Sequence, residues 1–199
     1  MTQIALFHSV LGVRPGVTDA AARLRAAGHQ VLVADLYAGE TFGDYGEAGL
    51  YVESIGGYSE LMRRAEASVR ALPDGFVAAG FASGAGVAEY VATRRRVGGV
   101  VMISGALPVE LLGTGSWPAG VPAQVHYTTG DPLRRQQQID SVAGSVRAAD
   151  ARAELFDYPG AGHQFTEASL ADEYQPAETA LLWERVLAFA PLQPPGLGE

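Results

Sequence analysis

The segment GFASGAGVAEY, residues 80–90, has the composition of a tight turn between a strand and a helix. It follows the apolar run 76–79 and leads into a stretch with helical spacing. A strand, a sharp glycine turn and a helix form the setting of a nucleophile elbow, which presents a Ser or Cys at its apex. Two alternatives are a plain strand-to-helix turn and a phosphate-binding turn, although the spacing does not match a P-loop.

Steric crowding identifies the apex residue of this turn. The residues two before and two after the apex approach each other closely, so both must be small. Ala82 as the apex places Gly80 and Gly84 at these positions. Ser83 as the apex would instead place Phe81 at the first of them. The nucleophile position is therefore predicted to be Ala82, whose methyl group cannot attack a carbonyl. Ser83 is expected to offer its backbone N–H to an oxyanion, and it is a weaker candidate nucleophile.

Two further segments place possible catalytic side chains directly after predicted strands. TTGDP, residues 128–132, contains Asp131, and YPGAGHQF, residues 158–165, contains His163. The carboxyl ends of parallel strands meet at one edge of a sheet, so both side chains should lie near the elbow. In a triad of this chain order, the His takes a proton and the Asp fixes its tautomer. Each residue alone could equally be a turn residue or a structural histidine.

The segment LFHSVLGVRPGV, residues 6–17, follows the first predicted strand and could supply a second oxyanion donor. The backbone N–H of Val10 is the expected donor, together with that of Ser83. Ser9 and Leu11 flank Val10 and are expected beside the substrate. A plain strand-to-helix loop is the alternative.

Three large aromatic side chains are candidates for the border of a substrate pocket. They are Phe81, Trp117 and Phe165. A pocket bordered by them would suit a small apolar ligand. Packing in the core is the alternative for each.

Short apolar runs alternate with longer amphipathic ones along the chain. Expected strands cover residues 4–7, 31–34, 76–80, 100–103, 123–128 and 153–158, and expected helices cover 17–27, 58–72, 84–95, 133–149 and 177–189. This alternation predicts an α/β fold with a mainly parallel sheet covered by helices on both faces. It favours one domain, residues 1–190, and a Pro- and Gly-rich tail, residues 191–199, that is expected to be disordered. Two irregular segments, 39–57 and 105–121, are expected to be pocket walls or lids.

Composition and charge argue against several classes of function. The 199 residues carry a net charge of −8, which argues against binding to nucleic acid or to an anionic membrane. The chain has no cysteine, so thiolate catalysis and cysteine metal sites are excluded. His8, His29 and His126 show no paired ligand spacing, and neither a metal nor a cofactor is expected. A cytoplasmic protein is expected, as a monomer or homodimer whose partner is a small-molecule substrate or ligand.

Together and in this order, the segments resemble the dienelactone hydrolase family, a compact branch of the α/β hydrolases. The resemblance covers residues 4–189 and rests on LFHSVLGVRPGV, RAAGHQVLVADLYAGETF, GFASGAGVAEY, TTGDP and YPGAGHQF. It implies an α/β-hydrolase fold and hydrolysis of a carboxylic ester or lactone without a cofactor. By resemblance, Asp131 and His163 match the acid and the base. Val10 and Ser83 match the oxyanion donors through their backbone N–H groups.

Two positions depart from the pattern of that family. The family carries Cys or Ser where this chain has Ala82, and a Glu where this chain has Ser9. The second departure matters less, since serine-type relatives can dispense with that Glu. The first leaves three interpretations of Ala82. It is an engineered substitution in an active enzyme, or the natural residue of an enzyme that uses His163 and Asp131 for hydrolysis, cyclisation or isomerisation without a covalent intermediate. In the third interpretation the chain is a binding protein that uses the same pocket.

Overall fold

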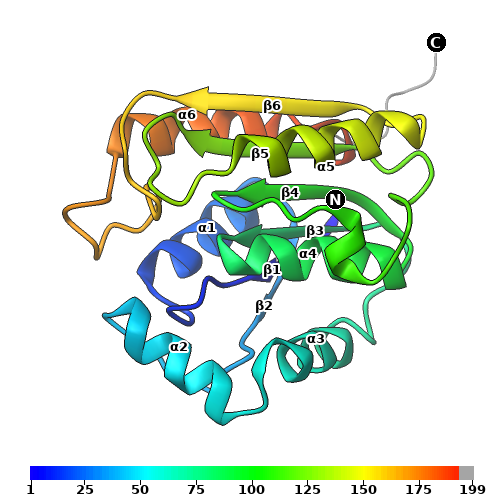
Figure 1. Ribbon diagram of the computed structural model, residues 1–199. Coiled ribbons are helices and arrows are strands. Elements are labelled where there is room, and N and C mark those ends of the chain that lie inside the picture. Colours follow the sequence, from blue (N-terminus) through cyan, green and yellow to red (C-terminus); the bar gives the residue numbers. More distant parts are fainter. Residues whose placement is uncertain (193–199) are drawn as a thin grey trace.

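The computed structural model describes residues 1–192 and contains a six-stranded parallel sheet (Figure 1). The strands are β1 (Gln3–Phe7), β2 (Gln30–Ala34), β3 (Phe76–Phe81), β4 (Val97–Ile103), β5 (Ala123–Thr128) and β6 (Ala153–Tyr158). Their order across the sheet is β2-β1-β3-β4-β5-β6. The helices are α1 (Pro15–Ala26), α2 (Tyr45–Ser54), α3 (Gly57–Ser68), α4 (Ser83–Arg94), α5 (Gln136–Ala148) and α6 (Pro176–Leu187), with short 3₁₀ helices η1 (Val109–Leu112) and η2 (Ala190–Leu192).

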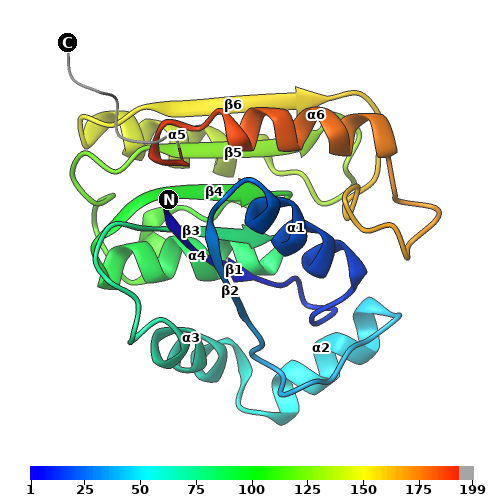
Figure 2. The same ribbon diagram turned by 180° about the vertical axis from the view of Figure 1, so that it is seen from behind.

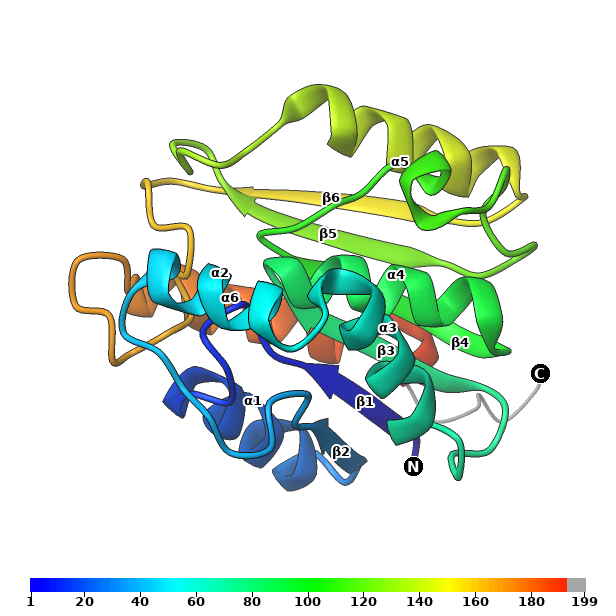
Figure 3. The ribbon, with the colours of Figure 1, turned by 60° about the horizontal axis from the view of Figure 1, so that its bottom comes forward.

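Helices cover both faces of this sheet, which confirms the predicted α/β fold. α4 and α5 lie in front of the sheet in Figure 1, and α1 and α6 lie in front of its other face in Figure 2. α3 packs beside α4, next to α2 (Figure 3). The side chains of β3 alternate between the two faces: Ala78 packs with α4, whereas Val77 and Ala79 pack with α1 and α6. A strand buried on both faces has the continuous apolar run seen at 76–79.

The strand order places two of the singled-out segments next to each other. β1 and β3 are neighbours in the sheet, but β1 leads into α1 on one face and β3 into α4 on the other. The connections after such a pair of strands diverge and leave a crevice, where open α/β sheets usually bind ligands. The loop after β1 and the turn after β3 both lie at this crevice.

The segment 39–57 contains a helix, α2, that was not predicted from the sequence. The Asp44 carboxylate caps this helix and accepts the N–H groups of Gly46 and Glu47 at 2.8 and 3.0 Å. Glycines inside the helix and only two buried side chains, Ala48 and Val52, make its apolar periodicity weak. The other predicted strands and helices are present, with ends shifted by a few residues.

The predicted tail, residues 191–199, lies mostly outside the described residues. Pro191 and Leu192 belong to η2, and the Leu192 N–H donates to the carbonyl of Phe189 at 2.9 Å. Within residues 1–192, no helix is both long enough and apolar enough to cross a bilayer.

Candidate active site

The turn between β3 and α4 holds Ala82 in a strained backbone conformation. Its φ and ψ angles are 49° and −114°, outside the regions that residues with a side chain favour. Its N–H donates to the carbonyl of Ile103 at 2.7 Å, and its carbonyl accepts the N–H of Ala85 at 2.9 Å. These bonds tie the turn to β4 and to the start of α4. Ala82 is thereby held at the carboxyl edge of the sheet, at the apex of an elbow-shaped turn.

Glycines make this sharp turn possible. A Cβ on Gly80 would lie 2.0 Å from the carbonyl oxygen of Gly84, and a Cβ on Gly84 would lie 2.3 Å from the carbonyl oxygen of His8. A Cβ on Gly105, after β4, would lie 2.2 Å from the carbonyl oxygen of Ala82. None of these positions has room for a side chain. Gly80 and Gly84 approach each other closely, and this crowding identifies Ala82, midway between them, as the apex.

Asp131 and His163 meet at the same edge of the sheet. His163 Nδ1 lies 2.8 Å from Asp131 Oδ2, and the Asp131 side chain is fully buried. The other carboxylate oxygen, Oδ1, accepts the N–H of Leu133 at 2.7 Å. Because a carboxylate only accepts, Nδ1 carries the hydrogen, and Nε2 of the neutral imidazole keeps a lone pair. This arrangement suits a general base whose tautomer is fixed by an acid.

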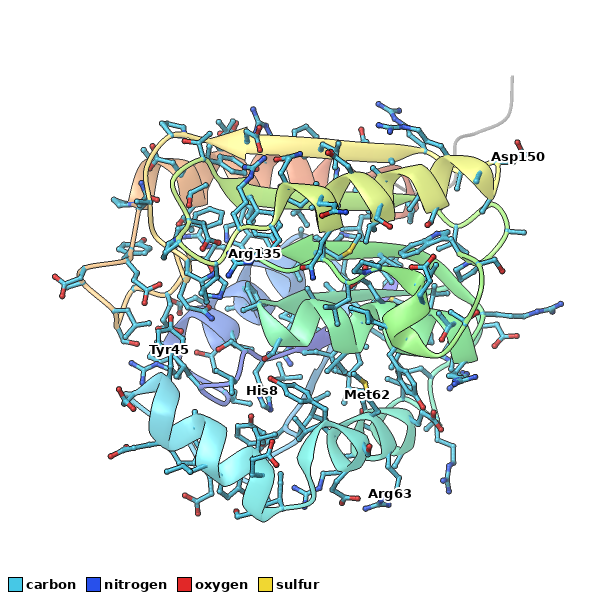
Figure 4. The ribbon with its side chains drawn as sticks, viewed as in Figure 1. His8, Tyr45, Met62, Arg63, Arg135 and Asp150 are labelled. Atoms are coloured by element: carbon cyan, nitrogen blue, oxygen red, sulfur yellow. The ribbon has the colours of Figure 1, made fainter. Side chains whose placement is uncertain are left out.

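Tyr45, the first residue of α2, packs edge-on against the His163 ring with 6.3 Å between ring centroids. Its hydroxyl donates to Glu173 Oε1 at 2.7 Å, and Glu173 Oε2 accepts the N–H of Gln164 at 2.6 Å. Burial and the neighbouring Glu173 raise the pKa of the Tyr45 phenol, so this hydroxyl stays protonated. Figure 4 shows Tyr45 at the end of α2 that faces the loop after β6. α2 therefore supports the loop that carries His163.

A cavity of about 670 Å³ opens at this edge of the sheet. Ala82, Ser83 and His163 lie on its wall, so three of the predicted site residues share one cavity. Asp131 is not on the wall, because it lies behind His163. The rest of the wall comes from α3, the segment 104–113, α4, the end of β5, the loop that follows it and α5.

The backbone N–H groups of Val10 and Ser83 lie where α4 packs against the loop after β1. A Cβ on Gly84 would lie 2.5 Å from the carbonyl oxygen of Phe7, which shows how closely the two segments pack. Ser83 is the first residue of α4, and N–H groups of a first helical turn have no acceptor within the helix. The N–H of Val10 has no acceptor within residues 1–192. Both groups are free to donate to an oxyanion, but Ser83 lies on the cavity wall and Val10 does not.

Ser9 and Leu11 were expected beside the substrate, but neither lies on the cavity wall. Both residues are buried, and Ser9 Oγ accepts the N–H of Leu11 at 3.2 Å. The carbonyl of Leu11 accepts the N–H of Phe42 at 3.0 Å. The two residues shape the loop around Val10 and do not contact the cavity.

Phe81, Trp117 and Phe165 lie in the core and not on the cavity wall, which corrects the expectation for all three. Phe81 points to the face covered by α1 and α6, because successive side chains of a strand alternate. Phe165 packs on the same face, 5.4 Å from the ring of Tyr158. Trp117 packs on the opposite face, and its Nε1 donates to the carbonyl of Val121 at 2.7 Å.

The apolar part of the wall consists of residues that were not predicted individually. Met62 points from α3 toward α4 (Figure 4), and Leu107 and Leu111 come from the segment after β4. Leu133 comes from the loop after β5. The irregular segment 105–121 was expected to form a pocket wall, and its first half does line the cavity.

Ser104, another residue not predicted, directly follows β4 beside the elbow. Its φ angle is 54°, which is rare for a residue other than glycine. Its N–H donates to the carbonyl of His126 at 2.8 Å. Its hydroxyl is on the cavity wall, is buried, and has no hydrogen-bond partner within residues 1–192. A buried hydroxyl without a partner is a group that a bound ligand can satisfy.

Glu89, on α4, is buried completely beside the same wall. Its Oε2 accepts the N–H of Leu107 at 2.9 Å, and its Oε1 has no partner within residues 1–192. Burial raises the pKa of the Glu89 carboxyl well above its ordinary value. The carboxyl therefore favours its neutral form while it anchors the segment after β4.

Two other buried histidines have structural partners. His8 Nδ1 donates to the carbonyl of Ser9 at 2.7 Å, and its Nε2 accepts a backbone N–H at 3.1 Å. His126 uses the opposite tautomer: Nε2 donates to Gln124 Oε1 at 3.2 Å, and Nδ1 accepts the hydroxyl of Tyr158 at 2.8 Å. Burial lowers the pKa of both imidazoles, that of His126 to about 3. Both rings are therefore neutral members of the framework.

The chain is similar to several known hydrolases. A dienelactone hydrolase-like promiscuous phosphotriesterase from metagenomic libraries has 19% identity and a TM-score of 0.75, with 94% of this chain and 84% of that chain covered. Esterase 2 of Thermogutta terrifontis has 18% identity and a TM-score of 0.61, with 98% and 85% covered. No curated protein matches. At these identities the solved structures show the fold alone. The sequence profile of the dienelactone hydrolase family, however, matches residues 2–191, and the chain belongs to this family.

Proposed function

We propose that this protein hydrolyses a small carboxylic ester or lactone, with His163 acting as a general base on a water molecule. The observation that carries the proposal is the buried Asp131–His163 pair, 2.8 Å between Oδ2 and Nδ1, whose His163 shares one cavity wall with the apex residue Ala82. Membership of a hydrolase family and likeness to an esterase support the reaction type. Because Ala82 has no nucleophilic atom, the proposal includes no acyl-enzyme at that position.

The proposed reaction uses the lone pair on His163 Nε2 as a proton acceptor. A water molecule beside the Ala82 methyl gives a proton to Nε2 as its oxygen bonds to the ester carbonyl carbon. The resulting oxyanion accepts the N–H groups of Val10 and Ser83. Asp131 stabilises the imidazolium that has formed. When the C–O bond to the leaving group breaks, the imidazolium returns the proton to that oxygen, and an acid and an alcohol leave.

Initial rates on a panel of nitrophenyl esters and simple lactones test this proposal. The chain with Ala82 is expected to exceed the buffer rate, and His163→Ala is expected to lose at least about 100-fold in kcat/KM. His29→Ala, which changes a half-buried histidine at the turn before β2, is the matched control and should keep full activity. Equal rates for the chain and for His163→Ala would contradict the proposal.

A second candidate function is non-covalent ligand binding, which the methyl group of Ala82 at the apex favours. The Ala82→Ser variant separates the two functions, because it introduces a hydroxyl where the elbow presents its side chain. Activity in Ala82→Ser together with none in the chain itself would contradict the proposed hydrolysis and leave two interpretations, a binding role or an engineered substitution at residue 82. Activity in both would support the hydrolase.

A further inference from the structure

We propose that the ligand of this cavity is an uncharged, largely apolar ester, with its carbonyl at the elbow and its apolar body along the leucine-rich wall. This inference rests on the proposed hydrolase function and adds the class of substrate to it. Three features of the cavity carry it: the absence of charged side chains on the wall, the apolar groups at the mouth, and the hydroxyl groups beside Ala82.

The described wall of the cavity carries no arginine, aspartate or glutamate, and the chain contains no lysine. Its titratable side chains are His163 and the phenols of Tyr58, Tyr90 and Tyr127. Burial raises the pKa of the Tyr127 phenol, and the hydrogen bond to Glu66 raises that of Tyr90. These two phenols are therefore neutral. A carboxylate drawn into this cavity would lose water and find no cation to pair with.

The arginines in the loops at this end of the sheet are already bound to other groups. Arg14 donates to the carbonyl of Phe42 at 2.6 Å. Arg134 donates to Asp157 at 2.7 Å, and Arg135 donates to the carbonyl of its neighbour Arg134 at 3.2 Å. Figure 4 shows Arg135 on the loop between β5 and α5. None of these three arginines lies on the cavity wall, and recruitment of a guanidinium by an anionic substrate would compete with these contacts.

Apolar side chains continue from the wall to the mouth of the cavity. Leu111 is 66% exposed, Leu133 is 52% exposed and Tyr58 is 51% exposed, although all three line the cavity. Apolar surface gathered at the rim of a pocket marks a ligand site. An apolar ligand body that covers these side chains removes them from water, which a short polar ester cannot do.

The opposite end of the cavity is polar. Ser83 and Ser104 line it next to Ala82, and the Ser104 hydroxyl has no partner within residues 1–192. One carbonyl group and one ester oxygen are enough to meet these donors. The cavity volume of about 670 Å³ falls in the range for ligands of several hundred daltons. The cavity thus has one polar end and one apolar end, like the ligand that we propose.

A matched pair of esters tests the charge of the ligand. The nitrophenyl ester of octanoic acid and the nitrophenyl monoester of suberic acid have acyl chains of equal length, but the second ends in a carboxylate. After correction for spontaneous hydrolysis, the neutral ester is expected to have a kcat/KM at least about 100-fold higher. The preference should persist at 1 M salt, where the Debye length is about 3 Å and the negative net charge is screened. A ratio near one, or one that collapses in salt, would overturn the inference.

Rim variants locate the preference in this cavity. Leu133→Arg and Leu111→Arg each add a cation at the mouth, and either is expected to raise activity on the anionic ester about tenfold, mainly through KM. Leu181→Arg adds the same charge to a half-exposed site on α6, across the sheet, and should leave the ratio unchanged. Equal effects of Leu181→Arg and the rim variants would place the preference outside the cavity and overturn the inference.

Binding without turnover separates this inference from the proposed hydrolysis. Calorimetry with the ketone 2-nonanone and with 8-oxononanoate, its carboxylate counterpart, is expected to give at least about tenfold tighter binding of the neutral ketone. If neither ester is hydrolysed but the neutral ketone still binds more tightly than the carboxylate, the proposed hydrolysis is wrong and the proposed class of ligand is supported. If the carboxylate binds as tightly as the neutral ketone, the ligand class is overturned, whatever the rates are.

Discussion

At the scale of single residues, the two oxygens of Asp131 have separate partners. Oδ2 holds the hydrogen on His163 Nδ1, and Oδ1 accepts the Leu133 N–H that shapes the loop after β5. An Asn side chain keeps this shape, but its NH₂ group can face Nδ1 and select the other tautomer. Nε2 then carries the hydrogen and cannot accept a proton from water.

We expect Asp131→Asn to lower kcat/KM for ester hydrolysis by between about 100-fold and 10,000-fold, the usual range for a general base. Steady-state rates check this, with circular dichroism to confirm the fold. Asp140→Asn, at an exposed position on α5, is the matched control and should not change the rate. An Asp131→Asn variant with full activity would show that the tautomer of His163 plays no part in the reaction.

Some site residues could be predicted from the sequence because local constraints determine their places. Ala82 is identified by the need for small residues on both sides of the apex, and Asp131 and His163 by their positions after strands. Phe81 and Trp117 could not be assigned by residue type, because the same aromatic side chain suits a core and a pocket. For Phe81, strand alternation from its buried neighbours is the signal that points away from the cavity.

At the scale of elements, the junction of β3 and α4 depends on glycine. We expect Gly80→Ala to lower the free energy of unfolding by about 3 kcal/mol, because its methyl group would lie 2.0 Å from a backbone oxygen. Gly144→Ala, in the interior of α5 with open space around it, should instead gain about 0.5–1 kcal/mol. Urea unfolding measures both. Equal effects of the two substitutions would contradict the crowding at the elbow.

The contact of α4 with the segment after β4 should depend on pH through Glu89. Because burial raises the pKa of the folded carboxyl, only the unfolded chain ionises as the pH rises above about 4.5. The neutral Glu89 carboxyl therefore contributes fully to stability below about pH 4.5. This contribution is lost as the pH rises toward the pKa of Glu89 in the folded protein. We expect Glu89→Gln to gain stability relative to the chain by up to about 1.4 kcal/mol per pH unit over this window.

Urea unfolding from pH 5 to pH 8 measures this difference. Glu184→Gln, at an exposed position on α6, is the control and should run parallel to the unsubstituted chain. A Glu89→Gln curve that also runs parallel would mean that Glu89 ionises alike in the folded and unfolded chain.

The parallel sheet was more predictable than the helices and loops around the site. Strands such as 76–81 are continuous apolar runs that end at turn residues, so their limits are local properties of the sequence. α2 depends on the Asp44 cap and on few buried side chains, so its apolar pattern is weak. Its role beside His163 comes from the tertiary contact of Tyr45, which no local pattern shows.

At the scale of the whole molecule, the cavity is a product of long-range packing. Its wall joins Met62 of α3, Leu107 and Leu111 of the segment after β4, and Leu133 before α5. These residues are far apart in the chain and meet only when the sheet has its final strand order. The segments of the cavity could therefore be predicted in part, and so could an apolar pocket, but the residues that make its wall apolar and the lack of charged side chains on it could not.

The stability of the whole fold should fall in acid partly through His126. Burial lowers the pKa of this imidazole to about 3, and the nearby Arg185 opposes its protonation. The neutral His126 ring contributes fully to the free energy of unfolding above about pH 6.5, which is the pKa of histidine in the unfolded chain. This contribution is lost as the pH falls toward 3, the pKa of His126 in the folded chain. Over this window we expect a loss on the order of 4 kcal/mol from this residue.

Urea unfolding from pH 7 to pH 4 gives the slope of the free energy of unfolding against pH, both for the unsubstituted protein and for His126→Gln. The variant should have a shallower slope, and its stability at pH 7 does not enter the comparison. His29→Gln, which changes a less buried histidine, is the control and should keep most of the slope. Equal slopes for the chain and His126→Gln would contradict a neutral, buried His126.

The central claim is that the Asp131–His163 pair hydrolyses an ester without a nucleophile at residue 82. The most direct measurement is residual esterase activity, together with intact mass, after treatment with a fluorophosphonate that labels active serines. The account predicts that the chain keeps its activity and its mass, whereas Ala82→Ser loses activity and gains one label at residue 82. Inactivation of the chain itself, with the label on Ser83 or Ser104, would contradict it.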